Sequence, residues 1–212
     1  MTTAEKALRS NRQPKIDWSY AGAPDPVTGT GAAISEQILM WIAGASASAF
    51  MVFLSRGGWV AWTWLETALA AVVAFDLVGG AVAFNLNSAK RFYHSPAQES
   101  EGRAIAFMKG PIYVPLTQFH PILVYLIYKP NAWATGVAIF LAGALSVAVI
   151  RIAPLFLARP LAILLTLMAS FSAVYAAPPV AGFEWLVPAF FLKLVLGFGV
   201  REEPYRPNAP RN

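Results

Sequence analysis

The sequence predicts an all-α integral membrane protein, a bundle of six transmembrane helices, and three observations lead to this fold class. The chain has 212 residues, of which 57% are hydrophobic and 13% charged, whereas soluble domains average roughly 45–50% apolar and roughly 25% charged residues. Six apolar stretches follow one another along the chain. Basic residues concentrate on every second connection between these stretches. Together these features exclude an ordinary soluble domain.

The six stretches have lengths that suit membrane-spanning helices. A hydrocarbon core ~30 Å thick needs about 20 helical residues, with roughly 17–25 tolerated. Lipid offers no hydrogen-bond partners, so each stretch must satisfy its own backbone groups as a helix. The second stretch is the longest and is expected to tilt or to extend past the bilayer. The predicted spans are residues 33–54, 59–84, 111–128, 132–150, 161–177 and 182–200.

Positive charges predict the orientation of the bundle. Of the sixteen Lys and Arg residues, thirteen fall on the side that carries both termini, two on the opposite side, and Lys193 inside the last stretch. Cytoplasmic loops are enriched in Lys and Arg, so this asymmetry places both termini in the cytoplasm. Tryptophans favour the membrane interface, and several cluster near the predicted outer helix ends. These are Trp59, Trp62, Trp64, Trp133 and Trp185.

The segments outside the six-helix domain, residues 33–200, are polar or rich in proline. Residues 1–32 contain several Pro and Gly and are expected to form a flexible cytoplasmic tail. Residues 201–212 contain three Pro and are expected to be a disordered cytoplasmic tail. Pro154 and Pro160 bracket an apolar segment that is expected to bend along the inner interface before the fifth span begins.

A short interfacial helix is predicted between the second and third spans. Ser95, followed by Pro96 and by Gln98 at the third helical position, is typical of a capped helix start. Gly110 supplies a stop signal. Apolar and charged residues alternate between these signals, which favours a helix over 96–109 that lies on the membrane surface.

Ionisable side chains inside the predicted spans are the first candidates for function. Such groups are costly in lipid, so each is either a functional group or part of a buried structural pair. Asp76 shares one helix face with Gly80 and Ala83, and small residues let another backbone or a flat ligand approach closely. This face predicts either simple helix packing or a ligand groove in which Asp76 is catalytic. The four ionisable residues are Glu66, Asp76, His120 and Lys193.

His120 is the second predicted catalytic residue. It lies between Pro115 and Pro121, and proline frees backbone carbonyls, so the third span is expected to be irregular. An unperturbed imidazole titrates at about pH 6.5, which suits proton transfer with Asp76. A neutral His120 bound to Gln118 or to a freed carbonyl is the structural alternative.

Lys193 lies too deep in the last span to reach either surface. It is therefore expected to be neutral or paired with Asp76 or Glu66. Glu66 and Lys193 are accordingly the candidate members of an intramembrane charge pair or relay.

A basic and aromatic cluster follows the second span. An ordinary positive-inside anchor explains Lys90 and Arg91. The functional interpretation is a site for an anionic headgroup or phosphate, because the cluster places several hydrogen-bond donors at headgroup depth. The predicted substrate-binding residues are Asn85, Lys90, Arg91, Tyr93 and His94.

The function predicted first is that of a membrane-embedded enzyme or binding protein for a lipid or isoprenoid-like hydrophobic molecule near the cytoplasmic leaflet. The alternatives are a small proton-coupled transporter or channel, and an accessory subunit of a membrane complex. Absence of Cys and the presence of two His residues predict no metal site, and no motif names a cofactor. The expected partners are the lipid bilayer and a hydrophobic small molecule, with a second copy or a membrane-complex subunit as further possibilities and no nucleic acid.

Overall fold

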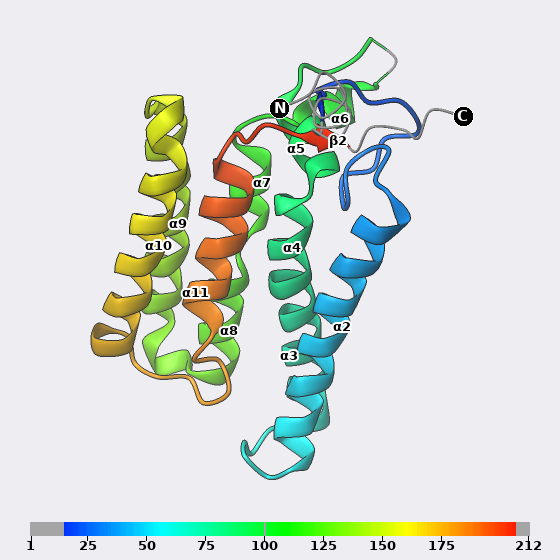
Figure 1. The fold of residues 1–212 in the computed structure, drawn as a ribbon. Helices are drawn as coiled ribbons and strands as arrows, with labels where there is room; N and C mark the ends of the chain where they lie inside the picture. The colour runs from blue at the N-terminus through cyan, green and yellow to red at the C-terminus, as the bar shows by residue number, and fades with distance from the viewer. Residues whose placement is uncertain (1–14, 100, 207–212) are drawn as a thin grey trace, which may run out of the picture.

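The computed structural model describes residues 15–99 and 101–206, which fold into a mostly helical bundle (Figure 1). Within these residues, four helices are long and apolar enough to cross a membrane. The bundle is therefore compatible with a multi-pass membrane protein. The four helices are Ile34–Arg56, Trp64–Asn85, Pro130–Ile152 and Leu155–Ala176.

The second of these helices contains a π-helical segment. It consists of α3 (Trp64–Ala74), η1 (Phe75–Gly79) and α4 (Gly80–Asn85). Leu86 then adopts an extended backbone with ψ 145°, which turns the chain into α5 (Asn87–His94). The preceding helix, α2 (Ile34–Arg56), packs against α3, η1 and α4.

The third predicted span is two short helices, because the backbone breaks between them. Gln118 at the break has ψ 47°, which is outside the helical region. The two helices are α7 (Tyr113–Thr117) and α8 (His120–Tyr128). The proline-rich sequence predicted this irregularity correctly.

The last three elements of the bundle follow η2 (Pro130–Ala132). The final helix is shorter than the four long ones and ends in a second π-helical segment. Its side chains Phe190 and Leu194 are fully buried, because the helix packs against α4 on one side and α9 and α10 on the other. These elements are α9 (Trp133–Ile152), α10 (Leu155–Ala176) and the final helix, α11 (Leu186–Phe191) with η3 (Leu192–Gly199).

Helix α10 differs from the predicted span 161–177. It begins at Leu155, directly after Pro154, and continues through Pro160. Proline removes a single backbone donor, and Pro160 is the sixth residue of a 22-residue helix, so one hydrogen bond is lost close to the helix start. The expected bent segment between Pro154 and Pro160 is therefore helical.

The helix between the second and third predicted spans is shorter than the predicted range 96–109. Helix α6 covers only Arg103–Met108, with Gly102 at its N-cap. Ser95 does not cap it, since the Ser95 hydroxyl donates to the Trp18 carbonyl at 3.3 Å. The Glu101 carboxylate accepts from the Gln98 backbone at 2.8 Å and holds a turn ahead of the helix instead.

The N-terminal segment is folded where the sequence predicted a flexible tail. The Ser88 hydroxyl of α5 donates to the Thr28 carbonyl at 2.5 Å. Gly29 has φ +85°, and its backbone lies so close to that of Ser88 and Ala89 that a side chain would overlap them. Polar groups of the segment are thus satisfied by α5, and residues 1–14 lie outside the described residues.

The beginning of the predicted C-terminal tail is also ordered. Strand β1 (Lys15–Ile16) pairs antiparallel with β2 (Tyr205–Arg206). The Tyr205 backbone also donates to the Asn87 side chain at 3.1 Å. These bonds fix the chain next to α5, and residues 207–212 lie outside the described part.

Candidate functional site

Three of the four predicted intramembrane ionisable residues meet in the bundle. His120 Nε2 lies 2.7 Å from Asp76 Oδ2, and the Lys193 ammonium forms an ion pair with the same oxygen. The sequence left open whether Lys193 would be neutral or meet Asp76 or Glu66. The structure selects Asp76, and we call Asp76, His120 and Lys193 the Asp76 cluster.

Each member of the Asp76 cluster lies at an irregular point of its helix. Asp76 belongs to the π-helical segment η1, and Lys193 to the π-helical segment η3. His120 is the first residue of α8, immediately after the break at Gln118. Local π-helical turns are frequent at functional sites, because they re-aim side chains out of the regular helix register.

The exposure of the three side chains is unequal. The Lys193 side chain is 3% exposed and the His120 side chain 14%, whereas the Asp76 side chain is 47% exposed. Both partners bind Oδ2, and no described residue donates a hydrogen bond to Oδ1. Asp76 therefore presents one carboxylate oxygen outward while the other is held by two donors.

The small-residue face of the second helix serves two packing tasks. Gly80 faces Lys193, whose side-chain carbons occupy the space that a methyl group on Gly80 would fill. Gly79 faces the other way, and a methyl group there would lie 3.3 Å from the Gly44 backbone of α2. Small residues thus allow both the close approach of α2 and the Lys193–Asp76 ion pair.

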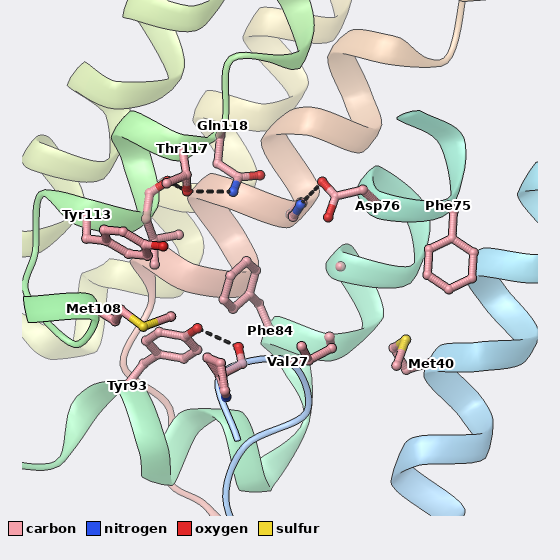
Figure 2. Close-up of a pocket in the computed structure, with 15 residues that line it drawn as sticks. Val27, Met40, Phe75, Asp76, Phe84, Tyr93, Met108, Tyr113, Thr117 and Gln118 are labelled. Carbon is pink, nitrogen blue, oxygen red and sulfur yellow. Dashed lines mark hydrogen bonds and ion pairs between the residues drawn. The ribbon is translucent and has the colours of Figure 1, made fainter. Parts of the chain in front are cut away.

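A cavity of about 260 Å³ extends from Asp76 toward α5 and α6, and we call it the Asp76 cavity. Figure 2 shows Asp76 and Gln118 at one end of its lining, and Tyr93 and Met108 toward the other. Most lining side chains are apolar or aromatic. They include Val27, Met40, Phe75, Phe84, Met108, Tyr113 and Val114.

The folded N-terminal segment contributes to this cavity, which the sequence did not predict. Pro26 and Val27 both line it. The Tyr93 hydroxyl donates to the Pro26 carbonyl at 2.6 Å and fastens the segment in place (Figure 2). No local pattern in residues 17–32 predicts this contact, because Tyr93 lies 67 residues after Pro26 in the sequence.

The segment before His120 was partly recognisable from the sequence. Tyr113 and Thr117 are four residues apart on α7 and both line the cavity. Gln118, the predicted alternative partner of His120, instead donates to the Thr117 hydroxyl at 3.3 Å. Gln118 Oε1 and His120 Nδ1 are buried without a hydrogen-bond partner among the described residues, so both retain the capacity to bind a polar group.

Most of the predicted substrate-binding residues lie apart from the Asp76 cavity, and Tyr93 alone of the five lines it. Asn85 is exposed and donates to the Ala81 carbonyl at 2.7 Å. Lys90 is 2% exposed and donates to the carbonyls of Gly197 and Val200, the latter at 2.8 Å. Lys90 therefore caps the end of the last helix, and its burial lowers the pKa of its ammonium to about 8.

The remaining candidates have other surroundings. Arg91 is buried within α5. His94 lines a second cavity, described below. Glu66 caps α3, because its carboxylate accepts from the Thr63 backbone at 2.7 Å and from the Thr63 hydroxyl at 2.8 Å. Glu66 thus satisfies a helix end and does not pair with Lys193.

The geometry brings together a half-exposed carboxylate, an imidazole, a buried ammonium and an apolar cavity. Such an arrangement can exchange a proton with the polar end of a hydrophobic molecule. Comparisons of the chain with protein-family models, curated proteins and solved structures find no match.

Proposed function

We propose that the protein is a membrane-embedded enzyme or binding protein whose ligand is a lipid or isoprenoid-like hydrophobic molecule. The Asp76 cavity holds the ligand, and Asp76 contacts its polar head. The observation that carries this proposal is the outward-facing carboxylate of Asp76 at the end of an apolar cavity. Ligand sites commonly combine an apolar lining with a few convergent polar groups.

The lining suits a hydrocarbon chain with one polar end. Phe75, Phe84 and Val114 offer apolar contact, while Gln118 and Asp76 offer polar contact at one end. The volume of about 260 Å³ holds a polar head and the first part of a chain. The rest of a longer chain would extend into the surrounding lipid.

The Asp76 cluster supports acid–base chemistry. Asp76 accepts a proton from the polar head at Oδ1 and later returns it from the same oxygen, while His120 donates its Nε2–H to Oδ2, 2.7 Å away, and holds the carboxylate in place. The Lys193 ammonium stabilises the carboxylate in its ionised form and orients it. Asp76 and His120 are thus the proposed catalytic residues, and Lys193 is a positioning residue.

We further propose six membrane crossings with both termini in the cytoplasm. Two crossings are the shorter elements, α7 with α8 and α11 with η3, which lie among the four long helices (Figure 1). Thirteen basic residues on one side against two on the other support this orientation. The Asp76 cavity then opens in the half of the bilayer nearer the cytoplasm.

A proton-conducting relay has less support. Such a relay needs linked titratable groups at several depths, and Glu66 was one of its predicted members. Within the described residues, no contact links Glu66 to the Asp76 cluster, because Glu66 is bound to Thr63.

The test of the proposal is the identity of the hydrophobic molecule that co-purifies with the protein. Wild-type protein and the variants Asp76→Asn and His120→Gln are purified in mild detergent, extracted, and analysed by mass spectrometry and absorption spectroscopy. We expect one hydrophobic species at near-stoichiometric amount in the wild type, lost or strongly reduced in Asp76→Asn. His120→Gln should reduce its turnover or retention.

Glu66→Gln is the matched control, because it changes an ionisable residue of the same helix and preserves the capping pattern. It should retain the ligand like the wild type. Monodisperse elution of every variant shows that the bundle has folded. Only bulk lipid in the wild type, or equal retention in Asp76→Asn, would contradict the proposal.

A further inference from the structure

A second cavity of about 310 Å³ lies where α9 ends and α10 begins, and we call it the His94 cavity. Its polar lining comes from three different parts of the chain. His94 is the last residue of α5, Arg151 lies in the last turn of α9, and Arg201 lies in the segment after η3. None of these residues belongs to the Asp76 cluster. The His94 cavity is therefore a separate site.

Its two guanidinium groups are held by aromatic rings. The Arg151 guanidinium lies 5.0 Å from the ring centroid of Phe198, and the Arg201 guanidinium lies 4.7 Å from that of Trp18. Among the described residues, neither forms an ion pair with a carboxylate. Cation–π contact fixes a guanidinium through its flat face, which leaves the N–H donors at its edge available for an anion.

The acidic residue next to Arg201 in the sequence already has a basic partner. Glu202, the neighbour of Arg201, accepts from Arg159 at 3.0 Å. Arg159 does not line the cavity. The local excess of positive charge at Arg151 and Arg201 thus remains without a counterion from this part of the chain.

His94 responds to that positive charge. Burial, together with the charges of Lys90, Arg151 and Arg201, lowers the pKa of its imidazole to about 3. The imidazole is therefore neutral near pH 7, with the Phe198 backbone as a hydrogen-bond partner, and adds no charge to the cavity. An anion in the cavity would meet two guanidinium groups and one neutral ring.

Helix α10 points its positive end at the same place. Leu155, its first residue, lines the cavity, and no side chain caps this 22-residue helix. Free backbone N–H groups and the helix dipole favour an anion at a helix start.

The surroundings suit a lipid more than a dissolved ion. The His94 cavity lies at the junction of two helices that are long and apolar enough to span a membrane, which is the depth of lipid headgroups. Large apolar side chains next to it are exposed, with Ile152 85%, Leu155 63% and Phe156 78% exposed. These provide a surface along which acyl chains can lie.

We infer that the His94 cavity binds the phosphate group of an anionic phospholipid, with Arg151 and Arg201 as its ligands. A headgroup phosphate and free inorganic phosphate share this chemistry. The exposed apolar side chains beside the cavity favour the lipid.

The test compares three probes on the full-length protein in neutral detergent. The probes are dioctanoyl phosphatidic acid, dioctanoyl glycerol, which has the same tails without phosphate, and inorganic phosphate. Binding is measured by native mass spectrometry and by the shift in thermal unfolding temperature. The variants are Arg151→Gln, Arg201→Gln and, as matched control, Arg103→Gln, which removes an exposed arginine that does not line the cavity.

We expect saturable binding of phosphatidic acid to the wild type, at least about tenfold tighter than that of inorganic phosphate. Arg151→Gln and Arg201→Gln should each weaken it about tenfold or more, as expected for loss of a charge-assisted hydrogen bond. Arg103→Gln should bind like the wild type. Arg151→Lys should recover part of the loss, because it keeps the charge and loses the planar fork.

Other outcomes overturn the inference. If dioctanoyl glycerol binds as tightly as phosphatidic acid, the protein recognises the acyl chains and not the phosphate. Equal weakening in Arg103→Gln would show that general surface charge suffices. If inorganic phosphate binds as tightly as phosphatidic acid, the ligand of the cavity is a soluble phosphate and not a lipid. Each variant is accepted only if its unfolding temperature without ligand stays within a few degrees of the wild type; if Arg151→Gln fails this, Arg151→Lys carries the test.

Discussion

At the scale of single residues, Asp76 and Lys193 differ in burial and in their number of partners. Lys193 is almost fully buried and meets a single carboxylate, whereas Asp76 is half exposed and has two donors. A buried charge that loses its partner is strongly destabilising. Asp76 keeps His120 if Lys193 is lost, whereas Lys193 keeps no ion-pair partner among the described residues if Asp76 is lost. The cost of breaking the pair therefore depends on which side is removed.

We predict that Asp76→Ala destabilises the protein more than Lys193→Met does. Asp76→Ala leaves the buried Lys193 ammonium without its ion-pair partner and removes the acceptor of His120. We expect this to lower the free energy of unfolding by about 3–5 kcal/mol. Lys193→Met leaves Asp76 bonded to His120. The free energy of unfolding of each variant is measured by denaturant titration in mixed micelles. An equal or greater loss for Lys193→Met would refute this asymmetry.

His94 makes the protein sensitive to acid. Its imidazole has a pKa of about 3 in the folded state, against 6.5 for an unperturbed histidine. The unfolded chain therefore binds more protons between these values, and stability falls as pH drops below about 6.5. Above that pH both states carry a neutral ring and the contribution is constant.

We expect the unfolding temperature of the wild type to decrease between pH 6.5 and pH 4 by more than that of His94→Gln. The difference between the two proteins isolates this residue from other titrating groups. Thermal unfolding followed by tryptophan fluorescence over this pH range provides the measurement. Parallel profiles for the two proteins would show that His94 is not responsible.

At the scale of elements, the functional geometry depends on departures from ideal helices. The sequence predicted the irregularity before His120, because prolines are visible in the chain. It did not predict the π-helical segments η1 and η3, since neither contains a residue that forces such a turn. Their register is set by the packing of one helix on another, which a single sequence leaves unspecified.

Gly80 is the point where η1 leads into α4 and where Lys193 crosses from the last helix. We predict that Gly80→Ala pushes the Lys193 side chain away from Asp76 and costs about 1–3 kcal/mol through overpacking. Gly102→Ala is the control, because a methyl group there meets no atom within 4 Å. Denaturant titration of both variants tests this, and a Gly80→Ala protein as stable as Gly102→Ala would contradict it.

How far the site could be predicted also differs between elements. Asp76, His120 and Lys193 were recognisable singly, because ionisable groups in apolar helices are rare. Their meeting was left open, since helix order in the chain does not fix which helices are neighbours. The contact between Tyr93 and the Pro26 carbonyl was not predictable, because a polar segment rich in Pro and Gly resembles a flexible tail until its partner surface is known.

At the scale of the whole molecule, four helices long and apolar enough to cross a membrane are present in the described residues. The two further crossings and the cytoplasmic placement of both termini remain the prediction made from apolar stretches and charge. The chain contains no Cys, which makes it suited to a direct test by single cysteine substitution.

We predict that Asn131→Cys and Glu184→Cys react with a membrane-impermeant maleimide applied to intact cells, whereas Glu99→Cys and Glu203→Cys react only after the membrane is opened. All four positions are exposed in the structure, so burial does not limit their reaction. The extent of labelling is read by mass shift on a gel. The reverse pattern would invert the orientation, and a split within either pair would change the number of crossings.

The Asp76 cluster also has a consequence for biogenesis. Asp76 precedes Lys193 by 117 residues, so the ribosome delivers the carboxylate to the bilayer long before its partner exists. An unpartnered aspartate at a helix centre opposes membrane insertion by about 2.5–3.5 kcal/mol. His120 emerges first and can donate a hydrogen bond to the carboxylate, but the Lys193 ammonium reaches it only when synthesis of the last helix is complete. A chain that stops short of that helix therefore keeps a carboxylate without this ammonium in the bilayer.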